Sequence, residues 1–211
     1  MGKKDVQTVE LITINPKTAV ITIEGDSDLI LNKMNDVSTR QLTREREDKA
    51  KNVNEKDNKW EKIITAMHWM NKPTDFSEAG LKEALKKDSV CLTAFGLKQS
   101  FKQALTRNKI ATYSTELDAT MNVVGQGDGL IPINFASHHI DEKLMSPKRG
   151  APVLVYLNRF SGWSAEVTIQ YLENVYSLDQ IINIVNLAGF GLGIGSGRSS
   201  GFGRYHVANV K

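Results

Sequence analysis

The residues with the clearest capacity for chemistry lie near the C-terminus, in the stretch GFGLGIGSGRSSGFGRYHV that begins at Gly189. Seven of the sixteen glycines fall between Gly189 and Gly203, and Arg198 and Arg204 accompany them. Glycine permits positive φ and lets the backbone approach a ligand closely. Backbone N–H groups in such a loop can converge on an anion, and arginine supplies forked donors for phosphate. The stretch therefore predicts a loop that binds phosphate groups.

Two common nucleotide-binding motifs do not fit this glycine-rich stretch. A dinucleotide-binding fingerprint needs a strand before the glycines and a helix after them, whereas here a helix is predicted before and a strand after. A phosphate-binding P-loop needs a lysine and a serine or threonine at the start of a helix, and that arrangement is absent. Two interpretations of the stretch remain. It is a loop that binds a polyanion or another chain, or it is only a tight connection between the helix and the strand.

A second basic segment is CLTAFGLKQSFKQALTR. Residues 90–93 are predicted to form a strand, residues 94–96 a corner of small residues, and a helix is expected from about Leu97. Lys98 and Lys102 are four residues apart and share a helix face. A helix that begins at a glycine corner has free N–H groups, so an anion is expected there too.

Two strands and a helix are predicted just before the glycine-rich stretch. Residues 152–158 and 164–171 read as strands joined at the turn RFSGWS into an antiparallel pair. The best helix follows in SLDQIINIVNLAGF, where Ser177 and Gln180 form a capping box. Gly189 stands where a left-handed glycine is expected to end that helix.

The order of these elements predicts the fold class. Strand, helix, glycine-rich loop and strand make half of the split unit of ferredoxin-like domains, and the segment 90–107 fits the other half. We expect one α+β domain over residues 1–211 with an antiparallel sheet. Charged residues of both signs fill about 36–62, which predicts a polar insertion. It would be a solvated helix or loop, or a lobe that touches a partner.

Composition and charge narrow the function classes only slightly. The formal net charge is +3 with an isoelectric point near 8.9, which is compatible with a polyanion partner. The single cysteine, Cys91, excludes an internal disulfide. The N-terminal MGKKDVQTVE lacks the apolar segment of a secretory signal, and no stretch approaches the length of a membrane span. A cytoplasmic protein without membrane contact, metal or other cofactor is expected.

Both basic segments resemble one family. GIGSGRSSGFGRYHV resembles the C-terminal glycine-rich loop and strand of the RAMP superfamily of CRISPR-associated RNA-binding proteins. CLTAFGLKQSFKQALTR is similar to the segment of these proteins in which a strand ends in a corner and opens a basic helix. The family usually has serines and a Lys-Gly pair there, where this chain has residues 95–100. The resemblance implies an RRM-like, ferredoxin-like core that grips one RNA strand without reading its sequence.

The resemblance also implies partners and contact residues. The expected partners are single-stranded RNA or single-stranded DNA, copies of the same chain along that strand, and other subunits of a CRISPR complex. The aromatic residues Phe190, Phe202 and Tyr205 are candidates for stacking on a base. The expected nucleic-acid contacts are Lys98, Ser100, Lys102, Arg107, Gly195, Ser196, Gly197, Arg198, Ser199, Ser200 and Arg204.

Catalysis is not expected, because no residue is selected for it. Some RAMP relatives use a histidine or an aspartate after the first strand to cut RNA, yet nothing here singles out Asp26, Asp28 or Asp36, or one of the four histidines. Two alternatives stay open. One is an endoribonuclease that is metal-independent or uses an aspartate. The other is an interaction protein of a phage or mobile element, either a mimic that occupies a CRISPR complex or a structural oligomer without nucleic acid.

Overall fold

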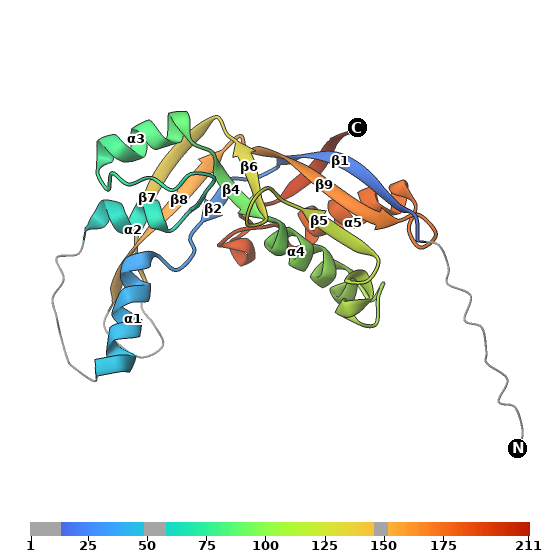
Figure 1. Cartoon of the computed structure of the whole chain (residues 1–211), viewed down its shortest axis with the longest axis horizontal. Coiled ribbons are helices and arrows are strands. Elements are labelled where there is room, and N and C mark those ends of the chain that lie inside the picture. Colours follow the sequence, from blue (N-terminus) through green and yellow to red (C-terminus); the bar gives the residue numbers. More distant parts are fainter. Residues whose placement is uncertain (1–13, 49–57, 146–151) are drawn as a thin grey trace, which may run out of the picture.

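The structure is a computed structural model that describes residues 14–48, 58–145 and 152–211 (Figure 1). Its larger sheet has seven strands, and the pairings between them are antiparallel. In spatial order these are β10 (Tyr205–Val210), β1 (Pro16–Gly25), β9 (Ser164–Leu172), β6 (Leu130–Asn134), β4 (Val90–Thr93) and β3 (His68–Trp69), while β5 (Met121–Val124) also pairs with β9.

A ferredoxin-like core lies within this sheet. The helices α4 (Ala94–Arg107) and α5 (Leu178–Gly191) pack on each other beside the strands (Figure 1). The elements β1, α4, β5, β9, α5 and β10 follow the βαββαβ order of that fold. The strand β1 lies between β9 and β10, and β5 pairs with the other side of β9. The predicted fold class is confirmed.

The strand before α4 has a different place from the one expected. β4 does not enter the four-stranded core, because it pairs with β3 and β6 farther along the sheet. The first core strand is β1, and residues 26–93 separate it from α4. Val90, Cys91 and Leu92 are all buried, so their pattern predicts a strand without choosing its neighbour.

The predicted antiparallel pair around RFSGWS is wrong in its pairing. The strand β8 (Val153–Ser161) lies between β2 (Leu29–Leu31) and β7 (Ser137–Met145) in a second, three-stranded sheet. Between β8 and β9, Trp163 is 1% exposed and its indole Nε1 donates a hydrogen bond to the Ser27 carbonyl (2.8 Å). This anchor lies against Gly25, where a Cβ would be 2.1 Å from Nε1. The chain therefore changes sheets at the tryptophan.

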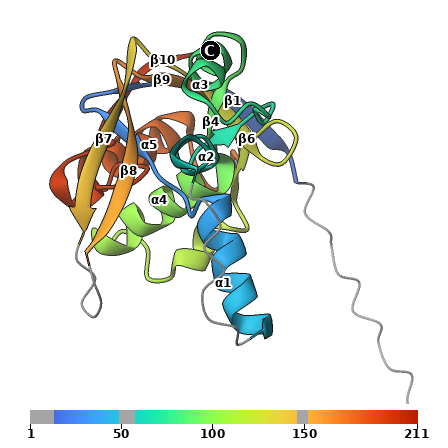
Figure 2. The same cartoon turned by 90° about the vertical axis from the view of Figure 1, so that its left-hand side faces the viewer.

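The residues between β2 and β4 form most of the remaining structure. They include α1 (Asp36–Asp48), α2 (Lys59–Thr65) and α3 (Glu78–Lys87). The predicted polar insertion at 36–62 maps to α1 and the start of α2, and residues 49–57 lie outside the described part. Figure 2 shows α1 and the β7–β8 pair extending from the body of the molecule. Within the described ranges, no helix is long and apolar enough to span a membrane.

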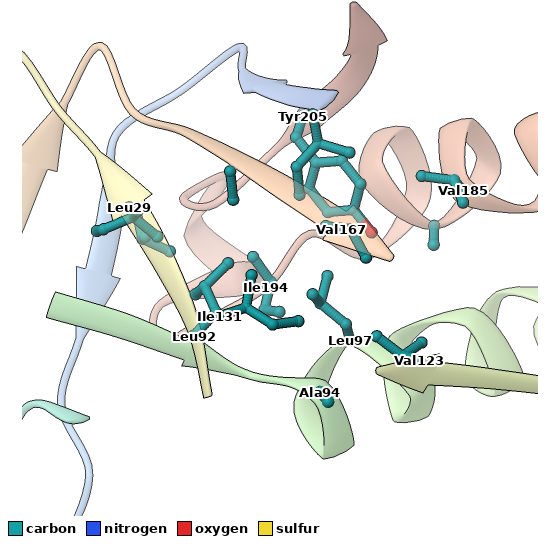
Figure 3. Close-up of a cluster of buried hydrophobic side chains, with 14 of the residues drawn as sticks. Leu29, Leu92, Ala94, Leu97, Val123, Ile131, Val167, Val185, Ile194 and Tyr205 are labelled. Carbon is teal, nitrogen blue, oxygen red and sulfur yellow. The ribbon is translucent and has the colours of Figure 1, made fainter. Parts of the chain in front are cut away.

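Two apolar residues anchor the glycine-rich stretch to the core. Leu192 and Ile194 alternate with glycines and are 8% and 6% exposed. Figure 3 shows Ile194 among Leu29, Leu92 and Leu97, which come from β2, β4 and α4. The loop is thus packed against three elements rather than suspended from its ends, and this fixes the position of its backbone.

Both helix ends near the site differ from the sequence prediction. The helix α4 begins at Ala94 instead of Leu97, because the Thr93 hydroxyl accepts a hydrogen bond from the Gly96 N–H (3.1 Å) and caps it. The capping box of Ser177 and Gln180 is confirmed. Gly189, however, lies inside α5, where a Cβ would be 2.0 Å from the Tyr205 carbonyl oxygen, so glycine is required there for close packing.

Candidate nucleic-acid interface

The glycines after α5 satisfy the loop's own geometry. Gly193, Gly195, Gly197, Gly201 and Gly203 all have φ between +70° and +86°. A Cβ would be 2.6 Å from the Gly203 carbonyl oxygen at Gly193, and 1.9 Å from the Ile194 carbonyl oxygen at Gly203. Most of these glycines are therefore needed for a tight backbone with positive φ, as expected if the stretch is a tight connection between helix and strand.

The same backbone presents unused donors. The N–H groups of Gly197, Arg198 and Ser199 have no hydrogen-bond acceptor among the described residues. They lie at the start of the short 3₁₀ helix η2 (Arg198–Ser200), where the first N–H groups have no partner inside the helix. The next N–H group, of Ser200, bonds the Gly197 carbonyl. Three neighbouring donors are thus free to bind an anion.

These donors line a groove that we call the basic groove. Its first part has a volume of about 480 Å³ and is lined by residues 195–199 together with Arg107 and Arg204. A second part of about 300 Å³ is lined by Lys33, Gln99 and Gln103, and shares Gly195, Ser196 and Arg198 with the first. Among the described residues, neither part is lined by an aspartate or a glutamate. Arg107 and Arg198 give the first part positive charge that no lining carboxylate offsets, whereas Lys33 in the second part lies 3.8 Å from Asp36.

One face of α4 forms a wall of the basic groove. Gly96, Gln99, Gln103 and Arg107 line it at spacings of three, four and four residues, which places them on one helix face. Lys98 and Lys102 lie on another face and bind Asp118, with Nζ to carboxylate distances of 3.5 and 2.6 Å.

The pairing with Asp118 changes the interpretation of the two predicted lysines. The hydrogen bond from Lys102 and the charges of both lysines lower the pKa of Asp118, so the carboxylate stays ionised and offsets one of their two positive charges. The contact of Lys98 and Lys102 with nucleic acid remains a prediction, and α4 directs them away from the groove.

The structure also places the predicted serines. Ser100 is 1% exposed and donates a hydrogen bond to the Gly193 carbonyl (3.0 Å), so its role is to join α4 to the loop. As a correction to the expectation, it is not accessible to a ligand. Ser196 and Ser199 line the basic groove, and Ser200 lies in η2.

The three predicted arginines differ in whether their guanidinium groups already bind another part of the protein. Arg204 donates from Nη1 to the Phe190 carbonyl (2.7 Å) and from Nη2 to the Arg198 carbonyl (3.4 Å), so it ties the end of α5 to the loop. Arg107 and Arg198 are exposed, and neither has an ion-pair partner among the described residues. These two guanidinium groups are therefore the best placed to bind phosphate.

Sequence reasoning missed the contributions of the residues between β1 and α4. Lys33 and His68 line the second part of the groove, and Lys33 lies 3.8 Å from Asp36. Burial and the nearby charge of Lys33 lower the pKa of His68, which keeps its imidazole neutral at pH 7. No local signal marks these residues, because they are about 30 to 165 positions from the residues that they face.

The three aromatic candidates have three different environments. Tyr205 is 1% exposed and belongs to the core (Figure 3). Phe202 lies under the Arg159 guanidinium, 5.4 Å from the ring centroid, and Arg159 is itself bound by Asp28. Phe190 is 84% exposed. Of the three, Phe190 alone offers an uncovered ring.

None of the candidate catalytic aspartates lines the basic groove. Asp26 binds His206 Nδ1 (2.7 Å), Asp28 binds Arg159 and Asp36 binds Lys72. In the described part of the chain, no cluster of three metal-ligating side chains occurs. Positive charge and free N–H groups, which can bind an anion, are the main features of the groove among the described residues.

Comparisons with known proteins give structural similarity only. No family model matches the chain, and no curated protein matches its sequence. The structure is similar to the type III-B Cmr-beta bound to cognate target RNA, with a TM-score of 0.49 and 8% identity over 93% of this chain and 60% of that one. It is also similar to Cmr6 from Pyrococcus furiosus, with a TM-score of 0.40 and 12% identity over 92% of this chain and 98% of that one.

The similarity to Cmr-beta covers only part of that protein. This chain spans about 60% of the Cmr-beta chain that it matches. Both solved structures are of Cmr proteins, and both TM-scores are below 0.5.

Proposed function

We propose that this protein binds single-stranded RNA in the basic groove, without sequence readout and without catalysis, as a subunit of a CRISPR effector complex. The observation that carries the proposal is the line of donors formed by the free N–H groups of residues 197–199 and by Arg107 and Arg198, with no carboxylate among the described residues that line this part of the groove. Arginine and backbone N–H groups are the usual ligands of nucleic-acid phosphates.

The dimensions of the groove favour one strand over a duplex. Its two parts have volumes of about 480 and 300 Å³, which is the size range of sites for small ligands. A few nucleotides of one strand fit such a space. Phosphate contacts fix the position of a strand but do not read its bases, so sequence-independent binding is expected.

The salt dependence of RNA binding tests this proposal. Fluorescence anisotropy with a labelled, mixed-sequence single-stranded RNA is expected to show affinity that falls steeply with salt, because bound phosphates release counterions. Arg198→Gln is expected to reduce the slope of log K against log salt by about 1. The control Lys86→Gln, on the exposed side of α3, should leave the slope unchanged.

Two outcomes would contradict the proposal. One is binding that does not respond to salt, and the other is an equal change of slope in Arg198→Gln and Lys86→Gln. If the wild-type protein bound no RNA and purified with a discrete protein partner and the absorbance ratio of pure protein, the interaction-protein alternative would replace it.

We further propose that copies of the chain assemble along the RNA through the end of the β7–β8 pair at which Met145 pairs with Val153. Leu144 and Val153 are 74% and 55% exposed, and their neighbours Met145 and Leu154 are exposed as well. Leu144 pairs with Leu154 and Met145 with Val153, so both faces of the ribbon end are apolar. Such exposed apolar clusters mark interaction sites.

Charge placed on one face of this ribbon end tests the assembly. In sedimentation experiments on a long RNA, the wild-type protein is expected to bind cooperatively as multiple copies. The variant Leu144→Glu with Leu154→Glu should bind a long RNA without cooperativity and a short RNA with unchanged affinity. Identical sedimentation of the variant and wild type on the long RNA would show that this end does not join copies.

A further inference from the structure

A separate apolar groove lies between α4 and α5. It has a volume of about 400 Å³ and is lined by Leu105, Ile110, Tyr176, Asn183 and Leu187, among others. Ile110 is 64% exposed. The lining combines aliphatic side chains, one aromatic ring and an exposed amide, which is the mixture that binds flat, partly polar ligands. The basic groove does not use any of these residues.

Residues of the two grooves follow each other along α5. On α5, Leu187 lines the apolar groove and Gly191 the basic one, about one helical turn later. A ligand with charged and flat apolar parts can therefore occupy both.

Phe190 is next to residues of both grooves along α5. Its spacing of seven and three residues from Asn183 and Leu187 places it on the helix face that lines the apolar groove, and its neighbour Gly191 lines the basic groove. The hydrogen bond from Arg204 Nη1 to the Phe190 carbonyl (2.7 Å) fixes the backbone beneath an 84% exposed ring. An exposed aromatic ring on a fixed backbone suits stacking, because little conformational freedom is lost on binding.

We propose that the apolar groove, with Phe190 at its rim, binds unpaired nucleobases of the strand whose phosphates lie in the basic groove. This inference rests on the proposed function and adds to it a selection for strands with exposed bases. Aromatic rings accept any base by stacking, so the selection is independent of sequence. Duplex RNA, whose bases are already stacked and paired, should be a poor ligand of this groove.

An abasic strand separates base binding from phosphate binding. The test compares a single-stranded RNA with an abasic strand of the same length by fluorescence anisotropy. Phe190→Ala is expected to weaken binding of the base-containing strand about tenfold and to leave the abasic strand unaffected. Phe190→Tyr should restore the affinity. The matched control is Phe95→Ala, because Phe95 is 73% exposed on α4 and lines neither groove.

Two further variants, Ile110→Ser and Arg198→Gln, distinguish failure of base binding from failure of phosphate binding. Ile110→Ser should reproduce the selective loss, since Ile110 lines the apolar groove away from Phe190. Arg198→Gln should weaken both strands alike, so the proposed function can stand while base binding fails. Equal weakening of both strands by Phe190→Ala, or the same loss in Phe95→Ala, would overturn the inference. The inference would also be overturned if Ile110→Ser bound RNA like the wild type but no longer bound a protein partner.

Discussion

Replacing Gly203 by alanine is expected to lower the free energy of unfolding by about 3 kcal/mol or more. Gly203 has φ +70°, which costs an alanine about 1–2 kcal/mol. A Cβ there would also lie 1.9 Å from the Ile194 carbonyl oxygen, a backbone atom that moves only with the loop. Because Ile194 is packed in the core, we expect both stability and RNA affinity to fall.

Two other glycines of the same stretch serve as controls. Gly201 has φ +86° but open space around its Cα, so Gly201→Ala should cost only about 1 kcal/mol. Gly191 is helical with open space, and Gly191→Ala should be neutral or stabilising by up to about 1 kcal/mol. Urea unfolding followed by circular dichroism measures all three. Equal effects of the three substitutions would contradict the described packing of the loop.

Reversing both free arginines of the basic groove is expected to weaken binding of single-stranded RNA by about 100-fold or more. The change is Arg107→Glu with Arg198→Glu. A hydrogen bond to a charged group contributes about 1.5–3 kcal/mol, and each 1.4 kcal/mol is a factor of ten in affinity. The introduced carboxylates also repel phosphate. Both side chains are exposed, so unfolding by urea should be little changed.

The matched control carries the same change in net charge on another surface. Lys82→Glu with Lys86→Glu alters two exposed lysines of α3, and the surface ion pair of Lys82 with Glu78 contributes little to stability. Titration at one fixed salt concentration should show a small loss for this control and the large loss for the groove variant. Comparable losses would show that net charge, not the basic groove, governs binding.

Several features of the fold could be predicted because they depend on neighbouring residues. The capping box of Ser177 and Gln180 is formed by side chains three positions apart, and the structure has it as expected. The glycine-rich stretch could be recognised as a left-handed, closely packed backbone for the same reason, since positive φ is a property of single residues. The left-handed residue after α5 is Gly193 and not Gly189, and the need for glycine at Gly189 comes from its contact with Tyr205, which the local pattern does not show.

Strand partners could not be predicted because buried strands carry no mark of their neighbours. Residues 90–93 and 164–171 are strands as expected, yet β4 pairs outside the core, and β8 and β9 belong to different sheets. The insertion of Trp163 beneath β1 moves the chain from one sheet to the other. This depends on Gly25 and Ser27, more than 130 residues earlier in the sequence.

By itself, the sequence determined the α+β class, the helix that leads into the glycine-rich loop, and the presence of Arg107, Arg198 and Arg204 in basic segments. Only the tertiary structure decided which cations are free to bind. Asp118 binds Lys98 and Lys102 and offsets one of their two charges, while Lys33, Gln99 and Gln103 join the groove. The physical reason is that charge compensation and exposure depend on distances through space, and folding brings together residues whose order in the chain does not show that they meet.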